Sequence, residues 1–173
     1  MQRAERYAPL TGVGAVVLWI VGTFLLEKDD RPDGKDTAAL VGWVEANDTA
    51  LVAGGIIFGF GVLFFVWVLG SLRSALLEAE GGAGRLSAIA FGSGIATSVC
   101  LMALSLFHAQ AAFDHDDISD TSIDALVHVG DAFFGGVELF SIPLLLATAI
   151  LTLRHGPLPR WLAGLVSCSC SRS

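Results

Sequence analysis

Ionisable side chains recur at helical intervals between positions 124 and 138. Asp124, His128, Asp131 and Glu138 follow one another after four, three and seven residues, which places them on one face of a helix. Glu138 is the deepest of them, about 10 Å beyond Asp131 by helical rise. Imidazole changes its charge near neutral pH, and a carboxylate inside an apolar stretch needs a partner or a water-filled cavity. This face could therefore bind a proton or a cation.

An earlier apolar stretch contributes a second row of polar side chains. Ser98, Ser105 and His108 follow a similar spacing, with His108 at the end of the stretch. The connection that follows is short, so the two helices are expected to be neighbours. His108 would then lie near the level of His128 or Asp131.

Two interpretations of these residues stay open. In the first, His108, His128, Asp131 and Glu138 line a polar funnel that opens to the outside and binds a proton or a cation. In the second, Glu138 is protonated and hydrogen-bonded within the helical bundle, while the other three are merely solvated at the membrane boundary. The sequence alone does not choose between them.

Other chemistries find little support in the sequence. The histidines and aspartates lack a rigid metal-ligand spacing, and the acidic cluster at 114–124 lacks the glycine and glutamate of an EF-hand. Ser93 lies outside the G-x-S-x-G pattern of a nucleophile elbow. Cys168 and Cys170 supply only two thiols. We expect no metal, no cofactor and no catalysis.

Long apolar runs fill most of the chain and determine its class. Only 16% of the residues are charged, well below the roughly 25% of a soluble domain. Four runs, at about 8–26, 50–72, 86–108 and 126–153, are long enough to cross a hydrocarbon core of about 30 Å, and such runs must be helical. The sequence predicts an all-α transmembrane bundle in one domain, 1–166, with the lipid bilayer as partner. With no basic patch, nucleic-acid binding is not expected.

A short amphipathic helix is expected in the first outer loop. Asp36 or Thr37 can cap it, and Leu40, Trp43 and Val44 form one apolar stripe over residues 37–46. We expect this helix to lie on the outer membrane surface or over the mouth of the bundle. Residue 48 or 49 would then cap the second span.

The distribution of basic residues predicts the orientation. With a cytoplasmic amino terminus, the inner segments hold six basic residues and the outer segments three, which the positive-inside rule favours. The protein is therefore expected in the plasma membrane. The inner residues are Arg3, Arg6, Arg73, Arg85, Arg154 and Arg160, and the outer ones are Lys28, Arg31 and Lys35.

Small residues are frequent in the predicted spans. Gly55 and Gly59 form a small-xxx-small pair, and Gly92 lies in similar pairs in the third span. Membrane helices associate where small residues let their backbones approach. These residues either pack the spans of one chain together or form a face for a homo-oligomer.

The carboxyl-terminal stretch is atypical. Residues 161–166 begin a fifth apolar run, which stops too soon to cross a bilayer and gives way to a tail of serine and cysteine at 167–173. We expect either a truncated or frame-shifted fifth span, or a short interfacial segment.

Four short motifs resemble those of a known group of proteins. YAPLTG at 7–12, VEANDT at 44–49, LRSAL at 72–76 and LPRWL at 158–162 resemble uncharacterised multi-pass integral membrane proteins of high-GC bacteria, a domain of unknown function. The resemblance implies a membrane protein and carries over no catalytic residue. We expect a structural or accessory role. The alternative is a small transporter-like or proton- or cation-responsive membrane protein that uses the acidic face at 124–138.

Overall fold

The fold consists of helices throughout. The computed structural model describes residues 8–28, 31–32 and 36–155. They form four helices, α2 (Ala8–Leu26), α3 (Thr37–Glu80), α4 (Arg85–Phe113) and α5 (Asp120–His155), and no strand occurs among them. The predicted all-α class is confirmed. The predicted fifth run at 161–166, the tail at 167–173 and the arginines at positions 3, 6 and 160 lie outside the described residues.

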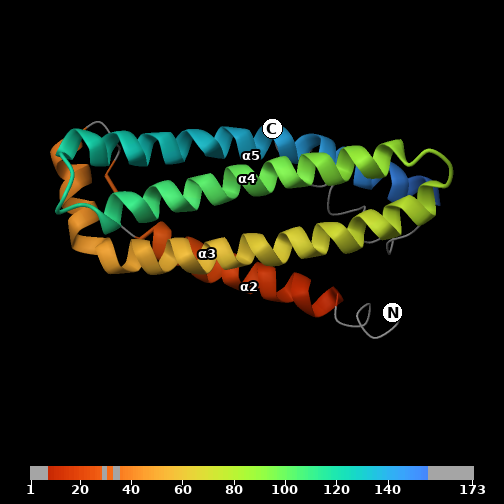
Figure 1. Ribbon diagram of the computed structural model, residues 1–173, viewed down its shortest axis with the longest axis horizontal. Coiled ribbons are helices and arrows are strands. Elements are labelled where there is room, and N and C mark those ends of the chain that lie inside the picture. The colour runs from red at the N-terminus through yellow and green to blue at the C-terminus, as the bar shows by residue number, and fades with distance from the viewer. Residues whose placement is uncertain (1–7, 29–30, 33–35, 156–173) are drawn as a thin grey trace.

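The helices run side by side along the long axis of the molecule (Figure 1). Helix α4 packs against both α3 and α5, α3 also touches α5, and α2 lies along α3. Glycines allow the closest approaches: a Cβ on Gly22 of α2 would lie 2.8 Å from the Cβ of Phe58, and one on Gly55 of α3 would lie 2.6 Å from that of Ala109. These small residues thus pack helices within one chain. A homo-oligomer through the glycine-rich helices stays a prediction.

The first outer helix and the second span, which were predicted as separate elements, are one continuous helix of 44 residues. Asp36 caps it as expected, because its side chain accepts hydrogen bonds from Ala38 N and Ala39 N. Separation of the two elements was wrong, since residues 47–49 continue the helix. Side chains take backbone partners at this point: Asn47 donates to the Trp43 carbonyl at 2.9 Å, and Asp48 accepts from Thr49 N.

The beginning of α3 nevertheless covers the end of the bundle. Figure 1 shows this part, in orange, running across the ends of α4 and α5 before α3 aligns with the other helices. Leu40 and Val44 are fully buried, in one apolar cluster with Ala111 of α4 and Ile123 of α5. This part of α3 therefore lies over the mouth of the bundle, which is one of the two expected positions. We call this end of the molecule, where α4 ends and α5 begins, the capped end.

At the opposite end, α3 and α4 are joined by a tight turn. The predicted spans at 50–72 and 86–108 left residues 73–85 as the connection, but α3 continues to Glu80 and only residues 81–84 connect the helices. Gly81, Gly82 and Gly84 have φ of 58°, 80° and 63°, a conformation that favours glycine. The Glu80 carboxylate accepts hydrogen bonds from the Leu86 and Ser87 N–H groups at 2.9 and 2.8 Å and so caps α4.

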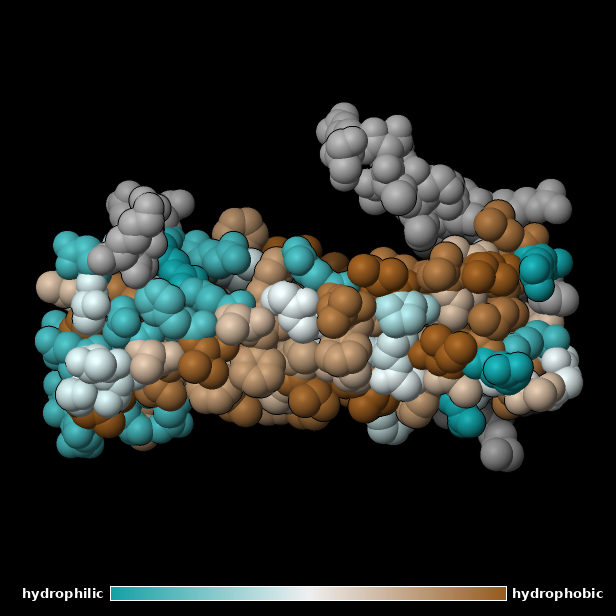
Figure 2. Space-filling model, turned by 90° about the horizontal axis from the view of Figure 1, so that it is seen from above, coloured by the Kyte–Doolittle hydropathy of each residue, from teal (hydrophilic) through white to brown (hydrophobic). Residues whose placement is uncertain are grey.

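The outer surface of the helices is apolar over most of its length. Three helices, α3, α4 and α5, are long and apolar enough to cross a membrane, whereas the apolar part of α2, Gly12–Leu26, is shorter. Bulky side chains such as Phe24, Trp67 and Leu139 are 64–75% exposed. Figure 2 shows this hydrophobic surface next to a hydrophilic end. Such a surface would be costly in water and is compatible with a membrane protein.

Candidate proton-binding site

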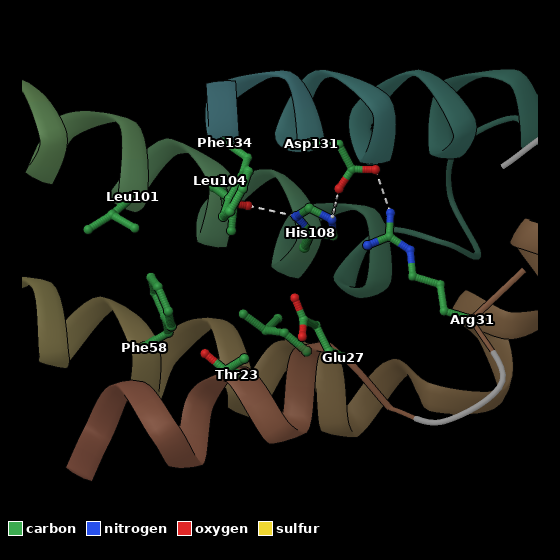
Figure 3. A pocket seen from close by; sticks show the side chains of 10 residues that line it. Thr23, Glu27, Arg31, Phe58, Leu101, Leu104, His108, Asp131 and Phe134 are labelled. Atoms are coloured by element: carbon green, nitrogen blue, oxygen red, sulfur yellow. Dashed lines mark hydrogen bonds and ion pairs between the residues drawn. The ribbon is translucent and has the colours of Figure 1, made fainter. Parts of the chain in front are cut away.

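A cavity of about 510 Å³ lies between the four helices near the capped end. Its lining divides into an apolar part and a polar part (Figure 3). The apolar part consists of Leu26, Phe58, Leu101, Leu104 and Phe134. The polar part consists of Thr23, Glu27, Arg31, His108 and Asp131.

His108 is the most deeply buried ionisable group of the cavity, with 5% of its surface exposed. Helix α5 makes room for it at Gly130, where a Cβ would lie 2.8 Å from both Cε1 and Nδ1 of the imidazole. The same Cβ would lie 3.2 Å from the Cβ of Phe107. The absence of a side chain at Gly130 therefore allows α4 and α5 to approach and fixes the imidazole against α5.

Both ring nitrogens of His108 face hydrogen-bond acceptors. Nδ1 lies 2.8 Å from the carbonyl oxygen of Leu104, and Nε2 lies 3.1 Å from Oδ1 of Asp131 (Figure 3). A carbonyl oxygen only accepts, so Nδ1 must carry a hydrogen. An ionised carboxylate also only accepts, so Nε2 must then carry one as well. Both contacts are satisfied together only if the pair holds one proton more than a neutral imidazole and a carboxylate.

Arg31 determines where this proton resides. Its Nη2 lies 2.5 Å from Oδ2 of Asp131, and its guanidinium carbon lies 5.9 Å from the centre of the Trp43 ring. A guanidinium this close favours the charged carboxylate. When the pair holds the extra proton, Arg31 therefore favours its location on the imidazole of His108, between Leu104 and Asp131.

The charges around His108 come from three other segments. Glu27 faces the cavity from the end of α2, Arg31 from the connection between α2 and α3, and Asp131 from α5 (Figure 3). Helix α3 contributes only Phe58 to the lining. With an imidazolium at position 108 these groups balance as two positive and two negative charges, and loss of the proton leaves one net negative charge.

Two of the four predicted site residues are brought together. His108 and Asp131 are in contact, and the predicted adjacency of α4 and α5 is confirmed. His128 is half exposed, and its Nδ1 lies 2.9 Å from the carbonyl of Asp124 on its own helix. Glu138 is exposed and does not line the cavity. Binding of a proton or cation by His128 or Glu138 stays a prediction.

The position of Glu138 follows from the packing of α5. The buried face of this helix runs through Ile123, Val127, Gly130 and Leu144. The row that contains Asp131 and Glu138 is displaced from this face by one residue, or about 100° around the helix axis. Asp131 still reaches His108 because α4 lies beside it, whereas Glu138 points away from the bundle core.

Arg31 and Glu27 are functional candidates that the sequence did not single out. Arg31 entered only the comparison of basic residues between loops, yet it pairs with a carboxylate 100 residues away. No local spacing signals such a pair. Glu27 directly follows the apolar run at 8–26, and its position in the sequence does not show that its side chain faces a cavity.

The described part of the chain brings no three His, Cys, Asp or Glu side chains together as a metal site would require. Its single cysteine, Cys100, is buried and unpaired, close to Gly136, where a Cβ would lie 2.8 Å from its sulfur. The histidine, carboxylates and guanidinium that line the cavity can bind protons and recognise charge. No protein-family model, no curated protein and no solved structure matches this chain.

Proposed function

We propose that the protein is a multi-pass integral protein of the plasma membrane that crosses the bilayer four times. The exposed apolar surface of α3, α4 and α5 supports this proposal. Helix α2 has 19 residues, which corresponds to a length of about 28 Å and is close to the thickness of a hydrocarbon core.

The proposed orientation places the amino terminus in the cytoplasm and the capped end outside. Arg73, Arg85 and Arg154 belong to the end opposite the capped end, whereas Lys28 and Arg31 belong to the capped end. The positive-inside rule favours this arrangement. The cavity would then open near the outer boundary of the membrane.

The function that the geometry supports best is a response to protons outside the cell. The observation that carries this proposal is the pair of acceptors around His108, namely Leu104 O and Asp131 Oδ1. When the imidazole loses its second proton, one of the two acceptors loses its donor. Leu104 lies on the same helix as His108, so proton loss weakens the contact between α4 and α5 when the remaining hydrogen is on Nδ1 and Asp131 Oδ1 loses its donor.

The test follows the protonation of His108 directly. The full chain, labelled with ¹⁵N-histidine and reconstituted into bilayer nanodiscs, is titrated between about pH 5 and about pH 8 by NMR. We expect His108 to carry hydrogen on both nitrogens at the acidic end, and Asp131→Asn to remove that form. His128→Gln, which changes a half-exposed histidine on α5, is the matched control and should leave the His108 titration unchanged. A single neutral tautomer of His108 throughout this range would refute the proposal.

The second candidate is a structural or accessory role without any response to protons. The saturation of Asp131 favours it, because one oxygen faces His108 and the other faces Arg31. In that case the triad of Arg31, His108 and Asp131 would only join the connection between α2 and α3 to α4 and α5. The same titration separates the two candidates, because a structural triad keeps one protonation state over the whole range.

A further inference from the structure

We infer that the cavity is a binding site for an amphiphile with a positively charged amine head group and an alkyl tail. This inference rests on the proposed function, because it places the ligand beside the proton held by His108. It adds a substrate class that neither the proton site nor the membrane topology specifies.

The lining of the cavity is itself amphipathic. Figure 3 shows Glu27, Arg31, His108 and Asp131 toward the capped end, while Phe58 and Leu101 lie toward the middle of the bundle. Leu101 and His108 are seven residues apart on α4, so the apolar part extends about 10 Å below the polar part. The volume of about 510 Å³ is that of a small-molecule site. A wholly polar ligand would meet the leucines and phenylalanines, and a wholly apolar one would leave the charged groups without partners.

The charges of the cavity select a cationic head. Glu27 has no salt-bridge partner among the described residues, and Figure 3 shows its carboxylate directed into the cavity. An anionic head would have to bind beside the carboxylates of Glu27 and Asp131, and Arg31 Nη2 and His108 Nε2 already face Asp131. An ammonium group can instead lie between Glu27 and Asp131, where it supplies the positive charge that the cavity loses when His108 is neutral.

Protons and the amine should therefore compete. When His108 is an imidazolium, the two carboxylates are already balanced by two positive charges. When it is neutral, one negative charge remains and attracts the head group. Binding of the amine should strengthen as the pH rises, and by linkage the bound amine should make His108 release its proton at lower pH.

The experiment uses spin-labelled dodecylamine as the probe and the full chain in nanodiscs of phosphatidylglycerol, a lipid without an ammonium group. The motionally restricted fraction of the probe is measured by electron paramagnetic resonance. Spin-labelled dodecanoate reports on the need for a cationic head, and competition by ethanolamine reports on the need for a tail. We expect a motionally restricted fraction for spin-labelled dodecylamine and none for spin-labelled dodecanoate. We also expect ethanolamine to displace little of the bound dodecylamine. Equal restriction of dodecanoate would overturn the inference.

Glu27→Gln is the decisive variant, because it removes one negative charge and changes the shape little. We expect its affinity for dodecylamine to fall about tenfold, the equivalent of one charged contact of about 1.4 kcal/mol. Glu45→Gln, at an exposed position of the capped end outside the cavity, is the matched control and should bind as the unaltered protein does. Unchanged binding by Glu27→Gln would sink the amine site.

The ¹⁵N-histidine titration of the Glu27→Gln variant separates this inference from the proposed function. If His108 still titrates while the amine does not bind, the proton site stands and the ligand assignment is wrong. If His108 does not titrate in either protein but the amine binds and Glu27→Gln weakens it, the ligand assignment stands and the proton response is wrong. Adding phosphatidylethanolamine to the nanodiscs then identifies the source of the amine. If the natural ligand is this lipid, it displaces the spin-labelled dodecylamine. If the natural ligand is a free amphiphilic amine, binding of the probe is unchanged by the lipid.

Discussion

Replacing Gly130 by alanine tests the contact on which the proton site depends. The added Cβ would lie 2.8 Å from Cε1 and Nδ1 of His108, whereas carbon atoms in contact prefer about 3.5–4.0 Å. The imidazole must therefore retreat by about 1 Å. That movement carries Nε2 from 3.1 Å to about 4 Å from Asp131 Oδ1, beyond the range of a hydrogen bond.

The expected cost of Gly130→Ala combines two opposing effects. Overpacking of a tight contact costs about 1–3 kcal/mol, and the better helix propensity of alanine offsets up to about 1 kcal/mol. The new methyl group cannot simply turn away from His108, because the Cβ of Phe107 would lie only 3.2 Å from it. We expect a net loss of about 1–2 kcal/mol in the free energy of unfolding together with loss of the doubly protonated form of His108.

The assay compares two alanine variants of the same helix. Gly135→Ala adds the same methyl group where nothing lies within 4 Å, so its stability should be unchanged or slightly higher. Unfolding is followed by circular dichroism in mixed detergent micelles, and the imidazole by ¹⁵N-histidine NMR. If Gly130→Ala matches Gly135→Ala in both measurements, the close approach of α5 to His108 is not real and the reasoning fails.

Two further predictions address regions outside the cavity. The Ala112 carbonyl accepts a hydrogen bond from Nδ1 of His115 at 2.8 Å and raises the pKa of His115 above its usual value, against the effect of burial. The folded state therefore favours the protonated imidazole. The stability that this contributes is complete below the pKa of the unfolded state and is lost as the pH rises through the pKa of the folded state. His115→Gln should remove this part of the pH dependence of thermal unfolding between about pH 6 and about pH 8, and an unchanged profile would contradict it. Gly55→Ala places a Cβ 2.6 Å from Ala109 and should destabilise the α3–α4 contact by about 1–3 kcal/mol, whereas Gly70→Ala meets nothing within 4 Å; equal unfolding midpoints would refute intrachain packing at Gly55.

Much of the secondary structure was predictable because it depends on local physics. Apolar runs of about 20 residues specify helices, and Asp36 marked the start of α3 through its capping side chain. The apolar stripe of Leu40 and Val44 indicated that residues 37–46 lie against an apolar surface, but it did not choose between the membrane surface and the mouth of the bundle. The continuity of α3 through Asp48 did not follow, because a capping residue in the sequence signals a possible start and does not exclude that a preceding helix continues.

The sequence predicted only those parts of the candidate site that depend on the spacing of residues within one helix. Helical spacing placed His108 and Asp131 at matching levels of neighbouring helices, and the two are indeed in contact. The same spacing placed Glu138 with Asp131 but could not tell which side of α5 faces the core, which depends on Val127 and Gly130 packing against α4. The contribution of Arg31 depends on the path of a connection between helices, and no periodicity encodes it.

The packing of α2 has a consequence for how the chain is assembled at the ribosome. Among the described helices, α2 makes its extensive contact with α3 alone, where Gly22 of α2 lies against Phe58 and Gly61 of α3 against Trp19. During synthesis, α2 therefore has no extensive docking surface until α3 has followed it. The two would then form a hairpin early, and the later pair, α4 and α5, would dock onto α3 and complete the cavity last.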